Sequence, residues 1–181
     1  MREVLDFFLE IIRIVILALV IVLPIRFFLF QPFIVKGESM EPTFKTGDYL
    51  LVDEISFRFR EPKRGEVIIF KNPQNLSQKF IKRVIGLPGD TVEIKNGKVT
   101  VFDSQGNEVL NLTEVENLAF SVPSQERVTL KENEYFVLGD NFLSSFDSRY
   151  FGPLPKKNII GRVFFRLWPF DSLGPIPAFA K

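Results

Sequence analysis

The first 30 residues contain the feature that most restricts how this chain folds. In "MREVLDFFLEIIRIVILALVIVLPIRFFLF" the centre, residues 14–25, carries no charge and is bracketed by Arg13 and Arg26. A helix needs about 20 apolar residues to cross a hydrocarbon core of ~30 Å. The uncharged centre is shorter than that, so we expect a span that extends to residues 7–30, with both arginines snorkelling.

A cleaved targeting peptide and a buried amphipathic helix both fit this segment less well. A cleaved targeting peptide would place small residues after its apolar part, whereas "PIRFFLFQPF" follows here. A buried amphipathic helix would have a polar face, and "IVILALVIVL" has none. We therefore predict one permanent membrane helix within residues 1–30, with the lipid bilayer as a partner, and a separate domain at residues 31–181.

Residue counts exclude several classes of protein. The chain has no cysteine and no histidine, so disulfides, thiol catalysis and a zinc site are not expected. We expect no metal and no cofactor. The net charge is +1, from 23 basic and 22 acidic residues, which argues against a nucleic-acid partner.

After residue 31 the pattern changes to short apolar runs between turn residues, which predicts β-strands. Residues 90–102 read as a hairpin whose Asn96-Gly97 pair suits a tight turn. No helical periodicity stands out beyond residue 31, so we predict an all-β domain. A more polar stretch at about 95–132 reads as a β insertion. The other predicted strands are "DYLLVDE" (48–54), "GEVIIF" (65–70), "KFIKRVIGL" (79–87), "EYFVLGD" (134–140) and "IIGRVFFRLW" (159–168).

A serine in "KGESMEPTF" (36–44) raises the question of catalysis. Glycine and proline flank Ser39, which indicates an irregular, exposed loop. A serine hydroxyl is a weak nucleophile until a neighbouring base takes its proton. Since the chain has no histidine, either Ser39 is an ordinary turn residue or an unusual base activates it.

A neutral lysine could be that base. The reference pKa of lysine is ~10.4, so near pH 7.5 only about one lysine in a thousand is neutral, unless burial lowers the pKa. Lys82 is the lysine set in strongly apolar sequence, inside "KFIKRVIGLPGD" with Phe80 and Val84 on its own face of the strand. Taken alone, such a residue more often snorkels over an apolar surface.

The segment "GDNFLSSFDSRYFGPLP" (139–155) supplies a third group of polar residues. Asp147 and Arg149 lie two residues apart, and serine and aspartate here could orient a lysine amine. The plainer interpretation is a loop braced by an Asp–Arg pair with no catalytic role.

These blocks, in this order, resemble the bacterial type I signal peptidases, a family of Ser/Lys serine proteases. "GESMEPTF" is similar to the nucleophile block of the family, "KRVIGLPGD" to the block with the general base, and "GDNFLSSFDSRYFG" to the closing block. The strand pair "YLLVDEISFRFREPKRGEVIIF" lies between the first two. The resemblance runs from about residue 31 to 165 and implies a catalytic core of antiparallel sheets with a variable β insertion.

Carried over by position, the resemblance implies that Ser39 is the nucleophile and Lys82 the general base. Ser145 would hold the Lys82 amine, and Asp147 and Arg149 would pair to brace that loop. Met40 follows the nucleophile. The residues implied to line the substrate cleft are Phe33, Val35, Phe44 and Ile81.

One position departs from the family. Some members have a serine two residues before the nucleophile, whose hydroxyl helps to stabilise the oxyanion. Gly37 stands there in this chain. The expected oxyanion site therefore relies on backbone N–H groups, including that of Ser39.

The resemblance also implies the substrate and the location of the site. The expected substrate is the A-x-A-like end of a signal peptide on an exported preprotein, bound extended along a strand edge. The catalytic domain would then lie outside the cytoplasm, at the surface of the bacterial cell membrane. Trp168, Phe170 and Phe142-Leu143 would dip into that surface, unless they are ordinary packing residues.

Three other functions remain as alternatives. A specialised relative that trims one pilin or conjugation substrate would carry the same motifs. A self-cleaving repressor-type protease shares the Ser/Lys pair, but needs a DNA-binding domain and an internal bond that is commonly Ala-Gly, and no Ala-Gly occurs here. A tethered β-domain that only binds partners would tolerate the loss of Ser39 or Lys82.

Overall fold

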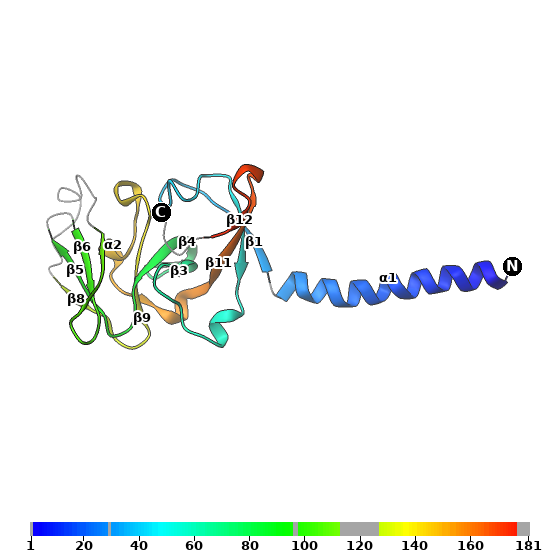
Figure 1. The fold of residues 1–181 in the computed structure, drawn as a ribbon, viewed down its shortest axis with the longest axis horizontal. Helices are drawn as coiled ribbons and strands as arrows, with labels where there is room; N and C mark the ends of the chain where they lie inside the picture. Colours follow the sequence, from blue (N-terminus) through cyan, green and yellow to red (C-terminus); the bar gives the residue numbers. More distant parts are fainter. Residues whose placement is uncertain (1, 29, 96–97, 113–126, 177–181) are drawn as a thin grey trace. The chain divides into compact units, whose positions relative to one another are not determined.

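The computed structural model describes residues 2–28, 30–95, 98–112 and 127–176. The chain divides into two units, Met1–Gln31 and Pro32–Lys181, and each is described here by itself. The first consists mainly of helix α1 (Arg2–Phe28), shown in blue in Figure 1. Its apolar side chains between Phe7 and Val20 are exposed. Among the residues that the structure describes, no helix meets the combined length and apolarity needed to cross a membrane.

The second unit is built on a large antiparallel sheet, which confirms the all-β prediction. The strand order is β1-β2-β11-β3-β4-β9-β10, and β12 also pairs with β11. All predicted strands outside the insertion are present. The bounds are β1 Phe30–Ile34, β2 Tyr49–Asp53, β3 Val67–Asn72, β4 Asn75–Gly86, β9 Glu134–Leu138, β10 Leu154–Pro155, β11 Ile159–Trp168 and β12 Gly174–Pro175.

A smaller antiparallel sheet lies at one end of this unit, where Figure 1 shows β5, β6 and β8. Its strand order is β7-β6-β5-β8. The predicted hairpin corresponds to β5 and β6, and its Asn96-Gly97 turn lies outside the described residues. The strand bounds are β5 Thr91–Lys95, β6 Lys98–Phe102, β7 Glu108–Leu112 and β8 Val128–Thr129.

Helical segments beyond α1 are short in the described part of the chain, which agrees with the absence of helical periodicity there. The longest is α2 (Ser148–Phe151), a single turn with Asp147 at its N-cap. The 3-10 turns are η1 Ser56–Arg58, η3 Phe142–Ser144, η4 Lys156–Asn158 and η5 Phe170–Ser172.

Both faces of the large sheet are covered by apolar side chains. Along β3, Val67 and Ile69 join one core cluster, while Ile68 and Phe70 join another. Successive side chains of a strand point to opposite faces, so a strand buried on both sides reads as an unbroken apolar run. This explains the run "VIIF" in the sequence. Each fully buried side chain of this size stabilises the fold by roughly 1.5–3 kcal/mol.

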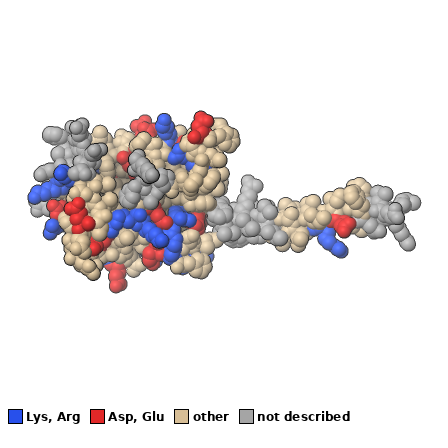
Figure 2. Space-filling view, viewed as in Figure 1, with Lys and Arg blue, Asp and Glu red and all other residues tan. Residues whose placement is uncertain are grey.

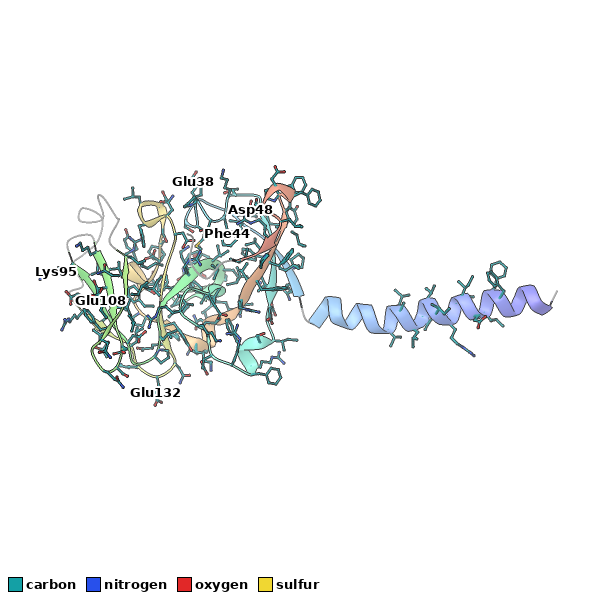
Figure 3. All side chains as sticks on the ribbon, in the orientation of Figure 1. Glu38, Phe44, Asp48, Lys95, Glu108 and Glu132 are labelled. Atoms are coloured by element: carbon teal, nitrogen blue, oxygen red, sulfur yellow. The ribbon has the colours of Figure 1, made fainter. Side chains whose placement is uncertain are left out.

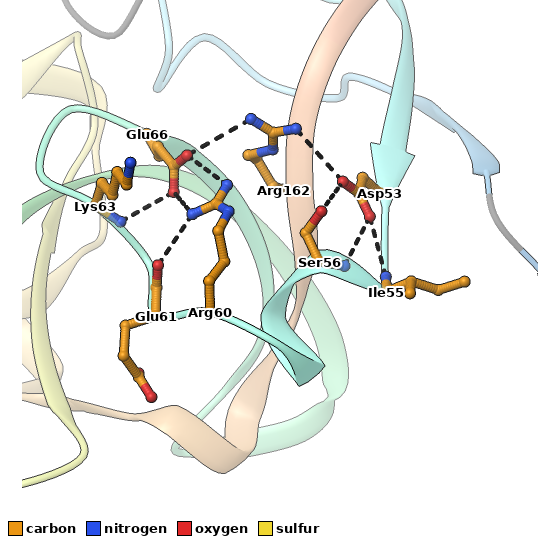
Figure 4. Close-up of polar contacts among 8 residues, drawn as sticks. All are labelled: Asp53, Ile55, Ser56, Arg60, Glu61, Lys63, Glu66 and Arg162. Atoms are coloured by element: carbon orange, nitrogen blue, oxygen red, sulfur yellow. Dashed lines mark hydrogen bonds and ion pairs between the residues drawn. The ribbon is translucent and has the colours of Figure 1, made fainter.

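The connection between β2 and β3 contains the basic loop "FRFREPKRG", in which Arg60 pairs with Glu66 and Arg64 with Asp90. Figure 2 shows that positive and negative side chains are intermixed on the visible face of the unit. In Figure 4, Arg60 makes a bidentate pair with Glu66, at 2.7 and 3.0 Å. Arg162 reaches both Glu66, at 3.6 Å, and Asp53, at 3.4 Å. The loop is thus held by a half-exposed ion network.

Candidate active site

Ser39 lies in the loop that joins β1 to β2. Gly37 has φ +93°, a left-handed conformation that favours glycine, and its N–H donates to Thr46 Oγ1 at 3.0 Å. Beyond Ser39, Met40 and Phe44 are fully buried and fix the loop to the core. Glu38 projects from the outer side of this loop, whereas Phe44 lies deeper in the domain (Figure 3). This arrangement leaves Ser39 half-buried.

Lys82 comes from the middle of β4, where it pairs in register with Ile68 of β3. Its side chain is buried, with 3% of the residue exposed. Its Nζ lies 2.7 Å from Ser39 Oγ, in hydrogen-bonding geometry, and donates to the carbonyl of Ile81 at 2.9 Å. The two residues singled out from the sequence are therefore in direct contact across a separation of 43 positions.

Burial changes the acidity of this amine. It lowers the pKa of Lys82 from its ordinary value of 10.5 to about 8, because the charged form loses its hydration. Asp147 and Asp140 favour the charged form and oppose this shift, while Arg149 adds to it. With a pKa of about 8, about a tenth of Lys82 is neutral at pH 7, and a neutral amine can accept the proton of Ser39.

Beneath the loop that follows β9, Asp147 and Arg149 form a fully buried ion pair. Arg149 Nε donates to Asp147 Oδ1 and its Nη2 to Oδ2, both at 2.8 Å. The same carboxylate also accepts from the Gly139 N–H at 3.1 Å and caps α2 through the Arg149 N–H. The pair therefore ties together the end of β9, the loop and the first turn of α2.

Ser145 is implied by the family resemblance to hold the Lys82 amine. Its hydroxyl donates to Asp147 Oδ2 at 2.6 Å. Within the described residues, the hydrogen-bond partners of Lys82 are Ser39 and Ile81, and Ser145 is not among them. The hydroxyl keeps its lone pairs while it donates to Asp147, so the role of Ser145 in holding the Lys82 amine stays a prediction.

Gly139 and Asp140 have roles that the sequence reasoning missed. A Cβ on Gly139 would lie 2.3 Å from both the carbonyl of Ser39 and Ser145 Oγ, so only glycine fits between the two loops. Asp140 forms a bidentate pair with Arg83, at 2.6 and 2.8 Å, on the face of β4 opposite Lys82. The sequence signal for both is "GDN", which by itself predicts only a turn.

The four residues expected to line a substrate cleft gather in one place, but mostly inside the core. Val35, Phe44 and Ile81 are buried in a single cluster together with Met40, and Phe33 packs against that cluster at the surface. Ile81 has 5% of its surface exposed. Their contact with a substrate remains a prediction.

The aromatic residues expected at a lipid surface are partly exposed. Trp168 and Phe170 are 48% and 72% exposed and pack edge to face. They line an apolar hollow of about 630 Å³ together with Tyr49, Leu167 and Leu173. Leu143 is also exposed, whereas Phe142 faces a smaller cavity of about 180 Å³.

The described residues offer no set of donors for a metal ion. No three carboxylates converge within the ranges that the structure covers, and the sequence lacks histidine and cysteine. The chemistry available at this site is therefore that of a serine hydroxyl beside a buried amine.

The amino-acid sequence of this chain is similar to those of known proteins. The family model "Signal peptidase, peptidase S26" matches residues 8–168. A probable signal peptidase I-2 of Synechocystis sp. is 37% identical over 92% of this chain and 76% of its own length. Signal peptidase I of Leptolyngbya laminosa is 39% identical over 88% and 79%, and signal peptidase IB of Staphylococcus aureus is 35% identical over 86% of both chains.

Proposed function

The chain belongs to the S26 family of signal peptidases and is a serine endopeptidase that removes signal peptides from preproteins; from this premise we propose that Ser39 and Lys82 form its catalytic dyad. The observation that carries the proposal is the 2.7 Å contact between Lys82 Nζ and Ser39 Oγ. The burial of Lys82 supports it, since a buried amine is more readily neutral.

The reaction would proceed through an acyl-enzyme. Neutral Lys82 takes the proton of Ser39 while Oγ attacks the carbonyl carbon of the scissile bond. The ammonium then returns a proton to the leaving amine, and the mature chain departs. A water molecule, deprotonated by the same amine, attacks the ester and releases the signal peptide, which regenerates Ser39.

Backbone donors would stabilise the negative oxygen that develops during attack. The N–H of Ser39 is the proposed donor, since position 37 has no side-chain hydroxyl. Gly37 has open space around its Cβ position and a left-handed backbone, so its part is to shape the loop. Asp147 and Arg149 support the reaction indirectly, because they hold the loop that contacts the carbonyl of Ser39 through the N–H of Asn141, at 3.0 Å.

The substrate motif would be A-x-A-like, and the peptide would lie extended beside β4. Two small side chains would sit in shallow depressions above the cluster that contains Phe33, Val35, Phe44 and Ile81. The tight packing of this cluster supports a preference for small residues, because a buried core does not yield space for large ones.

We further propose that residues 1–30 anchor the enzyme in the bacterial cell membrane and that residues 31–181, with an insertion at about 95–132, work on the extracytoplasmic side. The apolar side chains exposed along α1 support the anchor. The hollow around Trp168 and Phe170 supports contact with lipid, since aromatic residues favour the interface between water and hydrocarbon.

Cleavage of a purified preprotein by the detergent-solubilised enzyme tests the dyad. We expect the wild type to release a mature chain cut after its A-x-A motif, and Ser39→Ala to release none. Exposed Ser104, outside β4, provides the control substitution, Ser104→Ala. Cleavage by the Ser39→Ala variant at the wild-type rate would overturn the proposal.

A further inference from the structure

The two faces of β4 differ in chemistry next to the dyad. Ile81 belongs to the core cluster below the proposed pockets for small residues. Phe80 packs into the cluster on the opposite face. Lys82 shares the face of Phe80, and its Nζ lies 5.5 Å from the centre of the Phe80 ring.

The strand also offers a free edge to a substrate. One edge of β4 pairs with β3 from Asn75 to Arg83. On the other edge, within the described ranges, β9 pairs with Arg83, Val84 and Gly86, and no strand pairs with residues 75–82. Residues 75–79 are exposed. An extended peptide can therefore be added along this edge up to the position of Lys82.

Three aromatic side chains, Phe80, Phe146 and Tyr150, form what we term the aromatic ledge. Phe146 meets Phe80 edge to face at 6.3 Å and stacks on Tyr150 at 5.3 Å. Phe146 and Tyr150 remain 42% and 43% exposed. Its neighbours Ser145 and Asp147 are both buried, so the loop alternates between buried polar side chains and the exposed ring of Phe146.

We propose that the aromatic ledge is the specificity site for the substrate side chain that lies between the two small residues of the cleavage motif. The argument rests on the proposed function and on the alternation of an extended chain. If the two small side chains face the cluster of Ile81, the side chain between them faces Phe80 and Phe146. Aromatic rings there favour an aromatic or large apolar side chain. A carboxylate would lose hydration against the rings and would hold Lys82, on the same face, in its protonated and inactive form.

A series of preproteins that differ only at this middle position tests the proposal. For the wild-type enzyme we expect kcat/KM to be about three- to tenfold higher with Phe than with Ser at that position, the size of one aromatic contact. Asp should be the poorest of the series. In Phe146→Ala the preference for Phe over Ser should fall to within about twofold, because kcat/KM falls more for the Phe substrate than for the Ser substrate.

Phe59→Ala is the matched control, since Phe59 is an exposed phenylalanine, at 84%, outside the ledge. This variant should keep the full preference. Should Phe146→Ala fail to fold by circular dichroism, Phe146→Leu replaces it, because leucine keeps apolar volume without a ring. Its preference for Phe over Ser at the middle position of the substrate should fall below that of the wild type, because the contact between two rings is lost.

The outcomes separate this inference from the function on which it rests. A wild-type enzyme that cleaves every middle residue equally well overturns the ledge but leaves the dyad intact. An equal loss of kcat/KM on all substrates in Phe146→Ala also overturns it, since Phe146 would then affect the reaction without discriminating between substrate side chains. No cleavage of any substrate by the wild type would instead overturn the proposed function.

Discussion

Two charged clusters in the catalytic unit are built from similar residues but serve different ends. Beneath the catalytic loop, Asp147 and Arg149 have fully buried side chains, and every contact of the carboxylate is to its own loop, α2 or the end of β9. In the network between the β2–β3 connection and β11, Arg60, Glu66 and Arg162 keep 30%, 14% and 32% of their side chains exposed.

The difference shows how burial turns the same ion pair into a constraint. Water can replace the partners in the exposed network, so each contact there is worth little. Solvent does not reach the buried pair, so the loss of Asp147 or Arg149 leaves the charge of the other residue without compensation. The same low-polarity surroundings lower the pKa of Lys82, so the rigidity and the chemistry of the site have one physical origin.

The largest effect is expected where a permanent charge enters the buried region. Lys82→Arg should lower kcat/KM by at least about 10³-fold, because a guanidinium stays protonated and cannot take the proton of Ser39. Lys131→Arg, at an exposed lysine outside β4, should leave kcat/KM unchanged. Cleavage assays on both variants decide the matter, and near-normal activity of Lys82→Arg would refute the assignment of the base.

The next largest effect is expected when the buried pair loses one of its two charges. Asp147→Asn should lower the free energy of unfolding by about 3–5 kcal/mol, because Arg149 is left buried and unpaired. Urea titrations measure this directly. A loss below about 1 kcal/mol would mean that the buried pair is no stronger than a surface pair.

The pH dependence tests whether burial acts on the base. As pH rises through about 8, kcat/KM should increase, because Lys82 loses its proton there. The free energy of unfolding should also rise between pH 8 and 10.5, since the unfolded chain binds a proton that the folded chain does not. The total gain is on the order of 3 kcal/mol.

Lys82→Met provides the reference for this measurement. Its unfolding free energy should lack the rise that the wild type shows in this pH window, and at pH 7 it should be at least as stable as the wild type. Parallel stability curves for the two proteins would show that Lys82 titrates normally.

The smallest effect belongs to the exposed network. Arg60→Met should lower the free energy of unfolding by less than about 1 kcal/mol, because Glu66 keeps Arg162 as a partner. Added salt should shrink the difference further. Chemical denaturation at two salt concentrations measures both quantities, and a loss near that of Asp147→Asn would erase the distinction between the clusters.

The sequence alone predicted the longer strands of the large sheet, and it singled out Ser39 and Lys82, whose Oγ and Nζ lie 2.7 Å apart in the structure. The apolar runs indicated the strand positions because local alternation governs which residues face a core. Lys82 stood out because its immediate neighbours are apolar, and Ser39 because glycine and proline flank it. These are local properties, because they depend only on residues within a few positions along the chain.

Only the tertiary structure decided which groups meet. Ser145 donates to Asp147 and not to Lys82, Gly139 separates the two loops, and Phe146 lies beside Phe80. The position of Gly139 and the contact of Phe146 with Phe80 do not follow from spacing along the chain, because each depends on how segments remote in sequence are brought together by the packing of the cores beneath them. Local sequence was enough to predict the strands and to select candidate residues, whereas the packing of the cores decided which side chains they contact.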